Sequence, residues 1–268
     1  MAFLFFRGKF HANFTPFFAP KTTLAASATE VGSANVVGYS KITLPANAMT
    51  IVGNQFQNIG ETIINIQDIT VAGDFAQDGT DWIKFWDAST GSYQEAYFFG
   101  EEADGVFIDD NYEESLGAGW GDADQIVIDL DVNLGQGFWA QSVNGGSLVL
   151  NGEVSKNNTV NVPVNAMTLI ANPIPQAINI QDITVAGDFA QDGTDWIKFW
   201  DSSTGTYKEA YFFGEEADGV FADDTYEETL GAGWGDADQL IVDIKIDVGQ
   251  GFWVQSVNGG SVVFPTVE

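Results

Sequence analysis

The chain has no cysteine and only one histidine, His11. The lack of cysteine excludes a disulfide framework, a thiolate zinc site and a cysteine nucleophile. A single histidine leaves almost no basis for histidine-dependent catalysis or a histidine metal site. The sequence also lacks the G-x-S-x-G elbow, the phosphate-binding P-loop, the dinucleotide fingerprint and the H-E-x-x-H motif. We therefore predict a protein that is not an enzyme and that uses no organic cofactor.

Basic residues are scarce. Lysine and arginine together number 9 against 38 aspartates and glutamates, which gives a net charge of −29. Nucleic acids and anionic membranes require a basic surface, so neither is expected as a partner. No apolar run reaches the ~18 residues of a spanning helix, so no transmembrane segment is predicted. Hydrophobic residues make up 45% of the chain, which is enough to build a folded core.

The chain contains an internal repeat. Residues 66–150 align without a gap with residues 180–264 at an offset of 114, and 17 of these 85 positions differ. Upstream, residues 47–50 match residues 165–168 at an offset of 118, so the first copy has four more residues before position 66. Two repeats follow, at 37–150 and 151–268, and each has the size of a small β-sandwich domain.

Residues 1–36 differ from the repeats in composition. The first 20 residues hold seven phenylalanines with Arg7 and Lys9, and a small-x-small sequence ends at Ala28. A positive start, an apolar middle and a small-residue end are typical of a secretory signal. We expect a secreted or cell-surface protein that is cleaved near Ala28. The alternative is a structural arm that packs on a neighbouring subunit or on its own chain.

Strand signals dominate both repeats. Residues 37–44 and 49–53 are rich in β-branched side chains, and residues 125–132 alternate apolar and acidic side chains. The Asn144-Gly145-Gly146 sequence has the chemistry of a tight hairpin turn. Residues 64–71 hold at most one helical turn. The pattern predicts an all-β protein of two tandem antiparallel β-sandwich-like domains, or related barrels.

One predicted hairpin in each repeat has an aromatic face. A four-residue loop places Trp86 opposite Tyr93, Lys84 opposite Glu95, and Trp82 opposite Tyr97, all on one face because strand side chains alternate. The second repeat provides the equivalent aromatic residues Trp196, Trp200, Tyr207 and Tyr211.

Three interpretations of this aromatic face remain open. The rings can cover a second layer of their own domain, since aromatic cross-strand pairs stabilise hairpins. They can form a flat platform on which sugar rings stack. They can form a contact face between repeats or subunits, because tryptophan and tyrosine are enriched at the centres of interfaces.

Aspartates cluster around glycines in both repeats. Calcium binds about six to eight oxygen ligands and would relieve the repulsion between crowded carboxylates. The candidate ligands are the aspartates at two places in each repeat: Asp74, Asp78, Asp81, Asp104, Asp109 and Asp110, and their equivalents Asp188, Asp192, Asp195, Asp218, Asp223 and Asp224. The alternative is a solvated acidic surface that keeps the protein soluble.

Short motifs recur in both repeats. They are Leu44-Pro45 before the Asn47–Thr50 sequence, Gly119-Trp120, and the G-x-G-F-W sequence at 135–139 and 249–253. In these motifs the chain resembles a type of secreted bacterial tandem β-repeat protein with no assigned activity. The resemblance implies export and a repeated β architecture, and it brings no catalytic residue.

Taken together, these features predict a non-enzymatic, exported structural or adhesive surface protein that self-associates. Calcium would neutralise its acidic loops. The alternative is a bivalent carbohydrate-binding protein that uses the aromatic hairpin faces, because two weak sites in one chain bind a repetitive target with avidity.

Overall fold

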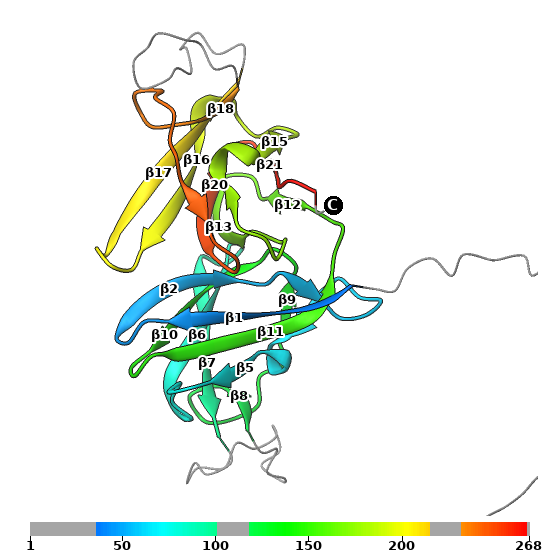
Figure 1. Ribbon diagram of the computed structural model, residues 1–268, viewed down its shortest axis with the longest axis vertical. Helices are drawn as coiled ribbons and strands as arrows, with labels where there is room; N and C mark the ends of the chain where they lie inside the picture. Colours follow the sequence, from blue (N-terminus) through cyan, green and yellow to red (C-terminus); the bar gives the residue numbers. More distant parts are fainter. Residues whose placement is uncertain (1–35, 101–117, 215–231, 267–268) are drawn as a thin grey trace, which may run out of the picture. The chain divides into compact units, whose positions relative to one another are not determined.

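The structure is a computed structural model that describes residues 36–100, 118–214 and 232–266. The regular secondary structure of these residues is almost entirely β-strand, and the strand pairs are antiparallel (Figure 1). The helical elements among them are two three-residue 3-10 turns, η1 (Ile66–Asp68) and η2 (Ile180–Asp182). The prediction of an all-β protein is confirmed, and no helix in the described ranges is long and apolar enough to cross a bilayer.

The first repeat holds two sheets. One has the strand order β1-β11-β3 with β5 also paired to β11, the other has the order β2-β10-β6-β7-β8, and β4 and β9 form a separate ribbon. The strands are β1 (Val37–Leu44), β2 (Ala48–Gly53), β3 (Phe56–Gln57), β4 (Ile63–Asn65), β5 (Thr70–Ala72), β6 (Asp78–Asp87), β7 (Ser92–Phe99), β8 (Gly119–Gly121), β9 (Asp131–Asn133), β10 (Gly137–Ser142) and β11 (Gly146–Val154).

The second repeat has the equivalent sheets. Their strand orders are β12-β21-β15 and β13-β20-β16-β17-β18, with β14 and β19 as the ribbon. The strands are β12 (Thr159–Val162), β13 (Ala166–Ala171), β14 (Ile178–Asn179), β15 (Thr184–Ala186), β16 (Asp192–Asp201), β17 (Thr206–Phe213), β18 (Gly233–Gly235), β19 (Lys245–Ile246), β20 (Gly251–Ser256) and β21 (Gly260–Val263). The first repeat alone has a β3, which pairs with the end of β11.

Each repeat has its own apolar core. In the first repeat one cluster takes Leu44 and Leu148 from the β1-β11-β3 sheet and Ile83 and Phe138 from the other sheet. A fully buried tryptophan, Trp120, anchors it: its indole Nε1 donates to Ile69 O at 2.7 Å. The second repeat repeats this arrangement around Trp234.

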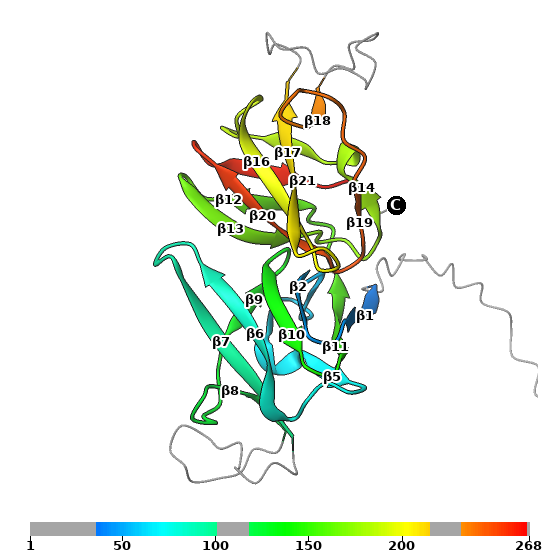
Figure 2. The ribbon, with the colours of Figure 1, turned by 90° about the vertical axis from the view of Figure 1, so that its left-hand side faces the viewer.

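The aromatic hairpin has the predicted register. In β6 and β7, Trp82 pairs with Tyr97, Lys84 with Glu95 and Trp86 with Tyr93. The two strands lie side by side in Figure 2, with β10 on the other side of β6. Because side chains alternate along a strand, Ile83 and Phe85 enter the core and the tryptophans point to the opposite face.

Two local expectations were wrong. Residues 125–132 do not form one strand; only β9, from Asp131, is extended there. The Asn144-Gly145-Gly146 turn does not close a hairpin, because β10 pairs with β2 and β6 whereas β11 pairs with β1, β3 and β5. Gly145 and Gly146 adopt φ of 83° and 125°, and this backbone carries the chain from one sheet to the other.

Candidate functional site

The aromatic faces of the two repeats meet each other. Trp86 Nε1 of β6 donates a hydrogen bond to Met167 O of β13 at 2.7 Å. Trp200 Nε1 of β16 donates to Met49 O of β2 at the same distance. Each tryptophan tip is therefore satisfied by a backbone carbonyl of the other repeat, and we call this contact the repeat junction.

An aromatic cluster fills the repeat junction. Ile51, Trp139, Leu169 and Trp253 are buried in it, and four half-buried tryptophans pack around them: Trp82, Trp86, Trp196 and Trp200. Trp86 meets Trp253 edge to face, with ring centroids 5.6 Å apart, and Trp139 meets Trp200 in the same way. Such pairs add about 0.5–1.5 kcal/mol beyond the area they bury.

Backbone hydrogen bonds also cross the repeat junction. Gly53 N donates to Gly249 O at 3.0 Å, and Ala171 N donates to Gly135 O at 2.8 Å. At an offset of 118 Gly53 corresponds to Ala171, and at 114 Gly135 corresponds to Gly249. Each contact thus occurs twice with the roles exchanged, which is the pattern of a two-fold, isologous interface.

The G-x-G-F-W motif is part of the repeat junction. Gly135 has φ of 74°, and a Cβ on Gly137 would lie 2.7 Å from Ile170 O of the other repeat. Phe138 points into the core, while Trp139 joins the aromatic cluster. The sequence showed only that this motif recurs in both repeats, and its place in the repeat junction was not predicted.

The rest of the aromatic face carries a small polar network. Lys84 Nζ lies 2.7 Å from Glu95 Oε1 and 4.3 Å from the centroid of the Trp82 ring. The Tyr97 hydroxyl donates to Glu95 at 2.5 Å. The hydrogen bonds from Lys84 and Tyr97 hold the pKa of Glu95 below its ordinary value, and the same bond to Glu95 raises the pKa of Tyr97.

The same network recurs in the second repeat. Lys198 Nζ lies 2.8 Å from Glu209 Oε1, and Tyr211 donates to Glu209. The two outer tyrosines, Tyr93 and Tyr207, are 42% and 41% exposed. Tyr93 is partly buried, and this burial raises the pKa of its hydroxyl.

The structure does not bring the predicted aspartate ligands together where it describes them. Within those ranges, no three acidic or histidine side chains form a group that could hold a metal ion. Asp74 and Asp188 are exposed, and Asp78 and Asp192 accept hydrogen bonds from Thr80 N and Thr194 N. Asp104, Asp109, Asp110, Asp218, Asp223 and Asp224 lie outside the described residues.

Asp81 has a different position from the one expected of a calcium ligand. It is completely buried, and its carboxylate accepts hydrogen bonds from Ala76 N, Ser142 Oγ and Val143 N. Its equivalent, Asp195, makes the same three contacts in the second repeat. These carboxylates hold a loop and the end of β10 or β20 together.

A pocket of about 610 Å³ opens at one side of the repeat junction. Trp86 forms part of its wall, and both repeats contribute polar side chains. The polar lining residues are Gln57, Thr62, Asn133, Gln136, Ser155, Asn157, Thr159, Asn161 and Thr168. Among the residues that the structure describes, none that lines this pocket is charged. We call it the amide pocket.

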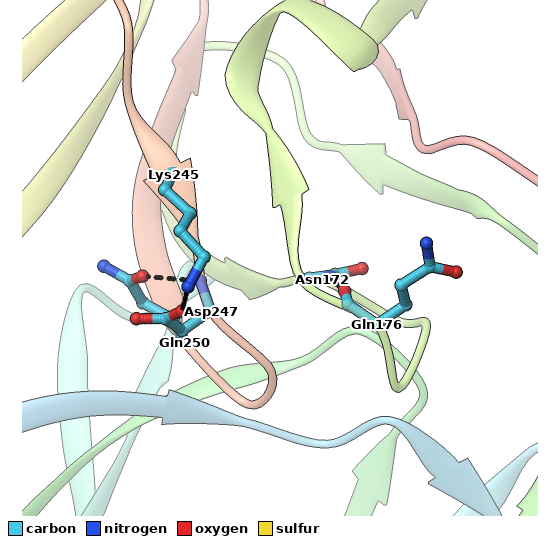
Figure 3. Close-up of polar contacts among 5 residues, drawn as sticks. All are labelled: Asn172, Gln176, Lys245, Asp247 and Gln250. Carbon is cyan, nitrogen blue, oxygen red and sulfur yellow. Dashed lines mark hydrogen bonds and ion pairs between the residues drawn. The ribbon is translucent and has the colours of Figure 1, made fainter.

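A second pocket, of about 320 Å³, lies in the equivalent place beside Trp200. Here Asp247 and Lys41 stand where the amide pocket has Asn133 and Thr159. Asp247 Oδ1 forms an ion pair with Lys245 Nζ at 2.5 Å, and the backbone N of Asp247 donates a hydrogen bond to Gln250 Oε1 at 3.0 Å (Figure 3). We call this the charged pocket.

Comparison with family models, with curated proteins and with solved structures finds no significant match for this chain.

Proposed function

We propose that the protein is a non-enzymatic adhesive protein that binds carbohydrate in the amide pocket. The observation that carries the proposal is a tryptophan wall beside a ring of uncharged amide and hydroxyl side chains. Its volume lies in the range of small-molecule sites, which run from about 300 to 1,000 Å³. A sugar presents hydroxyls, which both donate and accept, and asparagine and glutamine also do both.

The repeat junction explains why the site differs from the predicted flat platform. Trp82, Trp86, Tyr93 and Tyr97 were candidate stacking residues, but Trp86 packs on Trp253 and bonds to the other repeat. The amide pocket lies beside these rings and uses Trp86 as one wall. Aromatic rings supply apolar area for a sugar face while neighbouring polar groups fix its orientation.

The proposal includes the origin and location of the molecule. We propose that a duplication produced two β-sandwich-like repeats, which pair as two copies of one subunit would in a symmetric dimer. The reciprocal contacts of Trp86 and Trp200 support this view. Export to the cell surface fits an adhesive role and follows from the composition of residues 1–36.

A glycan array tests the proposed function. The matched variant is Gln57→Ala with Thr62→Ala, because neither side chain makes a hydrogen bond among the described residues and both line the amide pocket. The control is Gln94→Ala, an exposed residue of β7 outside the pocket. We expect wild type and the control to bind the same glycans, with at least about tenfold weaker binding by the pocket variant. An array without signal would contradict the proposal.

The predicted self-association with calcium remains a second candidate. Residues 101–117 and 215–231 each contain seven acidic residues and no basic one. Divalent cations would reduce the repulsion between such segments. Light scattering on a size-exclusion column, with calcium and then with a chelator, tests this. We expect assemblies that dissociate on chelation, and a monomer under both conditions would contradict it.

A further inference from the structure

The two pockets beside the repeat junction occupy equivalent places but differ in charge. We propose that the chain has one glycan site, the amide pocket, and that this site selects neutral sugar chains over anionic ones. This inference rests on the proposed function and adds the class of ligand and the number of sites.

The first argument is the lining charge. The chain carries 38 acidic and 9 basic residues, yet no charged residue of the described ranges lines the amide pocket. A uronic or sialic acid would find no cation there to pair with. It would also approach a protein of net charge −29, which repels anions over the Debye length. A neutral oligosaccharide needs no cation in the pocket and is not repelled by the net negative charge of the protein.

The second argument is the hydrogen-bonding capacity of the amide pocket. Gln57 and Thr62 line the pocket, and neither makes a side-chain hydrogen bond to another described residue. Groups that both donate and accept suit sugar hydroxyls, whereas anion sites are built from donors and cations. The lining therefore matches a neutral ligand in hydrogen bonding as well as in charge.

The third argument separates the two pockets. Gln57 and Thr62 belong to the segment in which the first repeat is four residues longer, and Ser155 and Asn157 belong to the start of the second repeat. The corresponding segments, 37–40 and 172–179, contribute no lining residue to the charged pocket. Its Asp247 is held by Lys245, and Lys41 adds another charge at its wall. A neutral sugar bound in the charged pocket would remove water from the charged groups of Asp247 and Lys41, and this desolvation costs free energy.

The experiment exchanges the distinguishing residues between the pockets. Asn133→Asp with Thr159→Lys gives the amide pocket the residues of the charged pocket, and Asp247→Asn with Lys41→Thr makes the opposite change. Each new residue already occupies the equivalent position in the other repeat, although Asp131 stands beside Asn133 where Lys245 pairs with Asp247. Circular dichroism and the elution volume verify the fold of both variants.

Isothermal titration calorimetry then measures binding of cellohexaose, laminarihexaose and mannohexaose as neutral probes, and of alginate hexamer as an anionic probe. We expect one neutral hexasaccharide to bind with one site per chain and the alginate hexamer to bind at least about tenfold more weakly. The Asn133→Asp and Thr159→Lys variant loses at least about tenfold in affinity, while the Asp247→Asn and Lys41→Thr variant binds like wild type.

The possible failures are distinguishable. Two sites per chain, tighter binding of alginate, or equal losses in both exchange variants would overturn this inference and leave the proposed function standing. Failure of every hexasaccharide, together with an array that shows no glycan at all, would overturn the proposed function and this inference together.

Discussion

At the scale of single residues, the buried aspartates Asp81 and Asp195 organise each repeat. Each carboxylate accepts two backbone N–H groups and one serine hydroxyl in a site closed to solvent. Charged acceptors strengthen such bonds to about 1.5–3 kcal/mol each, and loss of the acceptor leaves buried donors without a partner. These residues are therefore structural in the described fold.

The corresponding prediction concerns Asp81→Asn. The amide places a donor where the carboxylate accepted, so we expect the free energy of unfolding to fall by about 2–4 kcal/mol. Urea denaturation measures this. Asp74→Asn, at an exposed neighbouring position, is the control and should change stability by less than about 0.5 kcal/mol. Equal stability of both variants and wild type would show that Asp81 does not hold the loop.

The sequence could not separate these roles of aspartate. Asp74, Asp78 and Asp81 all lie near Gly79, and that spacing suggested a short metal loop. A carboxylate that accepts backbone hydrogen bonds and one that binds calcium need the same residue type near the same turns. The donors from Ser142 and Val143, 61 and 62 residues away, decide the role of Asp81, and the local sequence does not place them there.

At the scale of elements, the hairpin of β6 and β7 combines apolar packing with a polar network. Its register followed from loop length and alternation, and the structure confirms each predicted pair. The pairing of β11 with β1, β3 and β5 did not follow, because a glycine turn with positive φ serves a hairpin and a sheet crossing equally well. Long-range pairing depends on the core, which local signals do not encode.

The hairpin network predicts a dependence on pH. The pKa of Glu95 is lowered by Lys84 and Tyr97, so its contribution to stability is complete above the ordinary value of 4.5 and is lost as the pH falls through the lower folded value. The pKa of Tyr97 is raised by Glu95, so its contribution is present below the ordinary value of 10.0 and is lost as the pH rises through the higher folded value.

Glu95→Gln with Glu209→Gln tests this dependence. The exposure of both ion pairs keeps their contribution small, in the range of about 0–1 kcal/mol each. We expect the variant to lose less stability than wild type when the pH falls below 4.5, as measured by urea midpoints from pH 6 to pH 3. Parallel losses in wild type and variant would show that these glutamates do not contribute.

The G-x-G-F-W motif makes a second prediction at this scale. In Gly137→Ala the new Cβ would lie 2.7 Å from Ile170 O, a contact that backbone must move to relieve. We expect a looser repeat junction, seen as a red shift of tryptophan fluorescence and faster proteolysis between the repeats. Gln94→Ala, at an exposed position of β7, is the control. Unchanged fluorescence and proteolysis in Gly137→Ala would contradict the assigned role of the motif.

At the scale of the whole molecule, the proposed carbohydrate site is the amide pocket, which neither repeat forms alone. Trp86, Asn133 and Gln57 come from the first repeat, while Asn161 and Thr168 come from the second. The aromatic faces were recognisable in the sequence as an interface or a sugar platform. The amide pocket was not, because its residues are scattered polar positions that become neighbours only when the two repeats pair.

The indole N–H signals of the protein test this account most directly. The chain has eight tryptophans, and Trp86 and Trp200 occupy equivalent places beside the two pockets. Two-dimensional NMR of the indole groups, assigned with Trp86→Phe and Trp200→Phe, follows titration with the neutral glycan that binds best. We predict that the Trp86 signal shifts and the Trp200 signal does not. Equal shifts of both, or a shift of Trp200 alone, would contradict binding in the amide pocket.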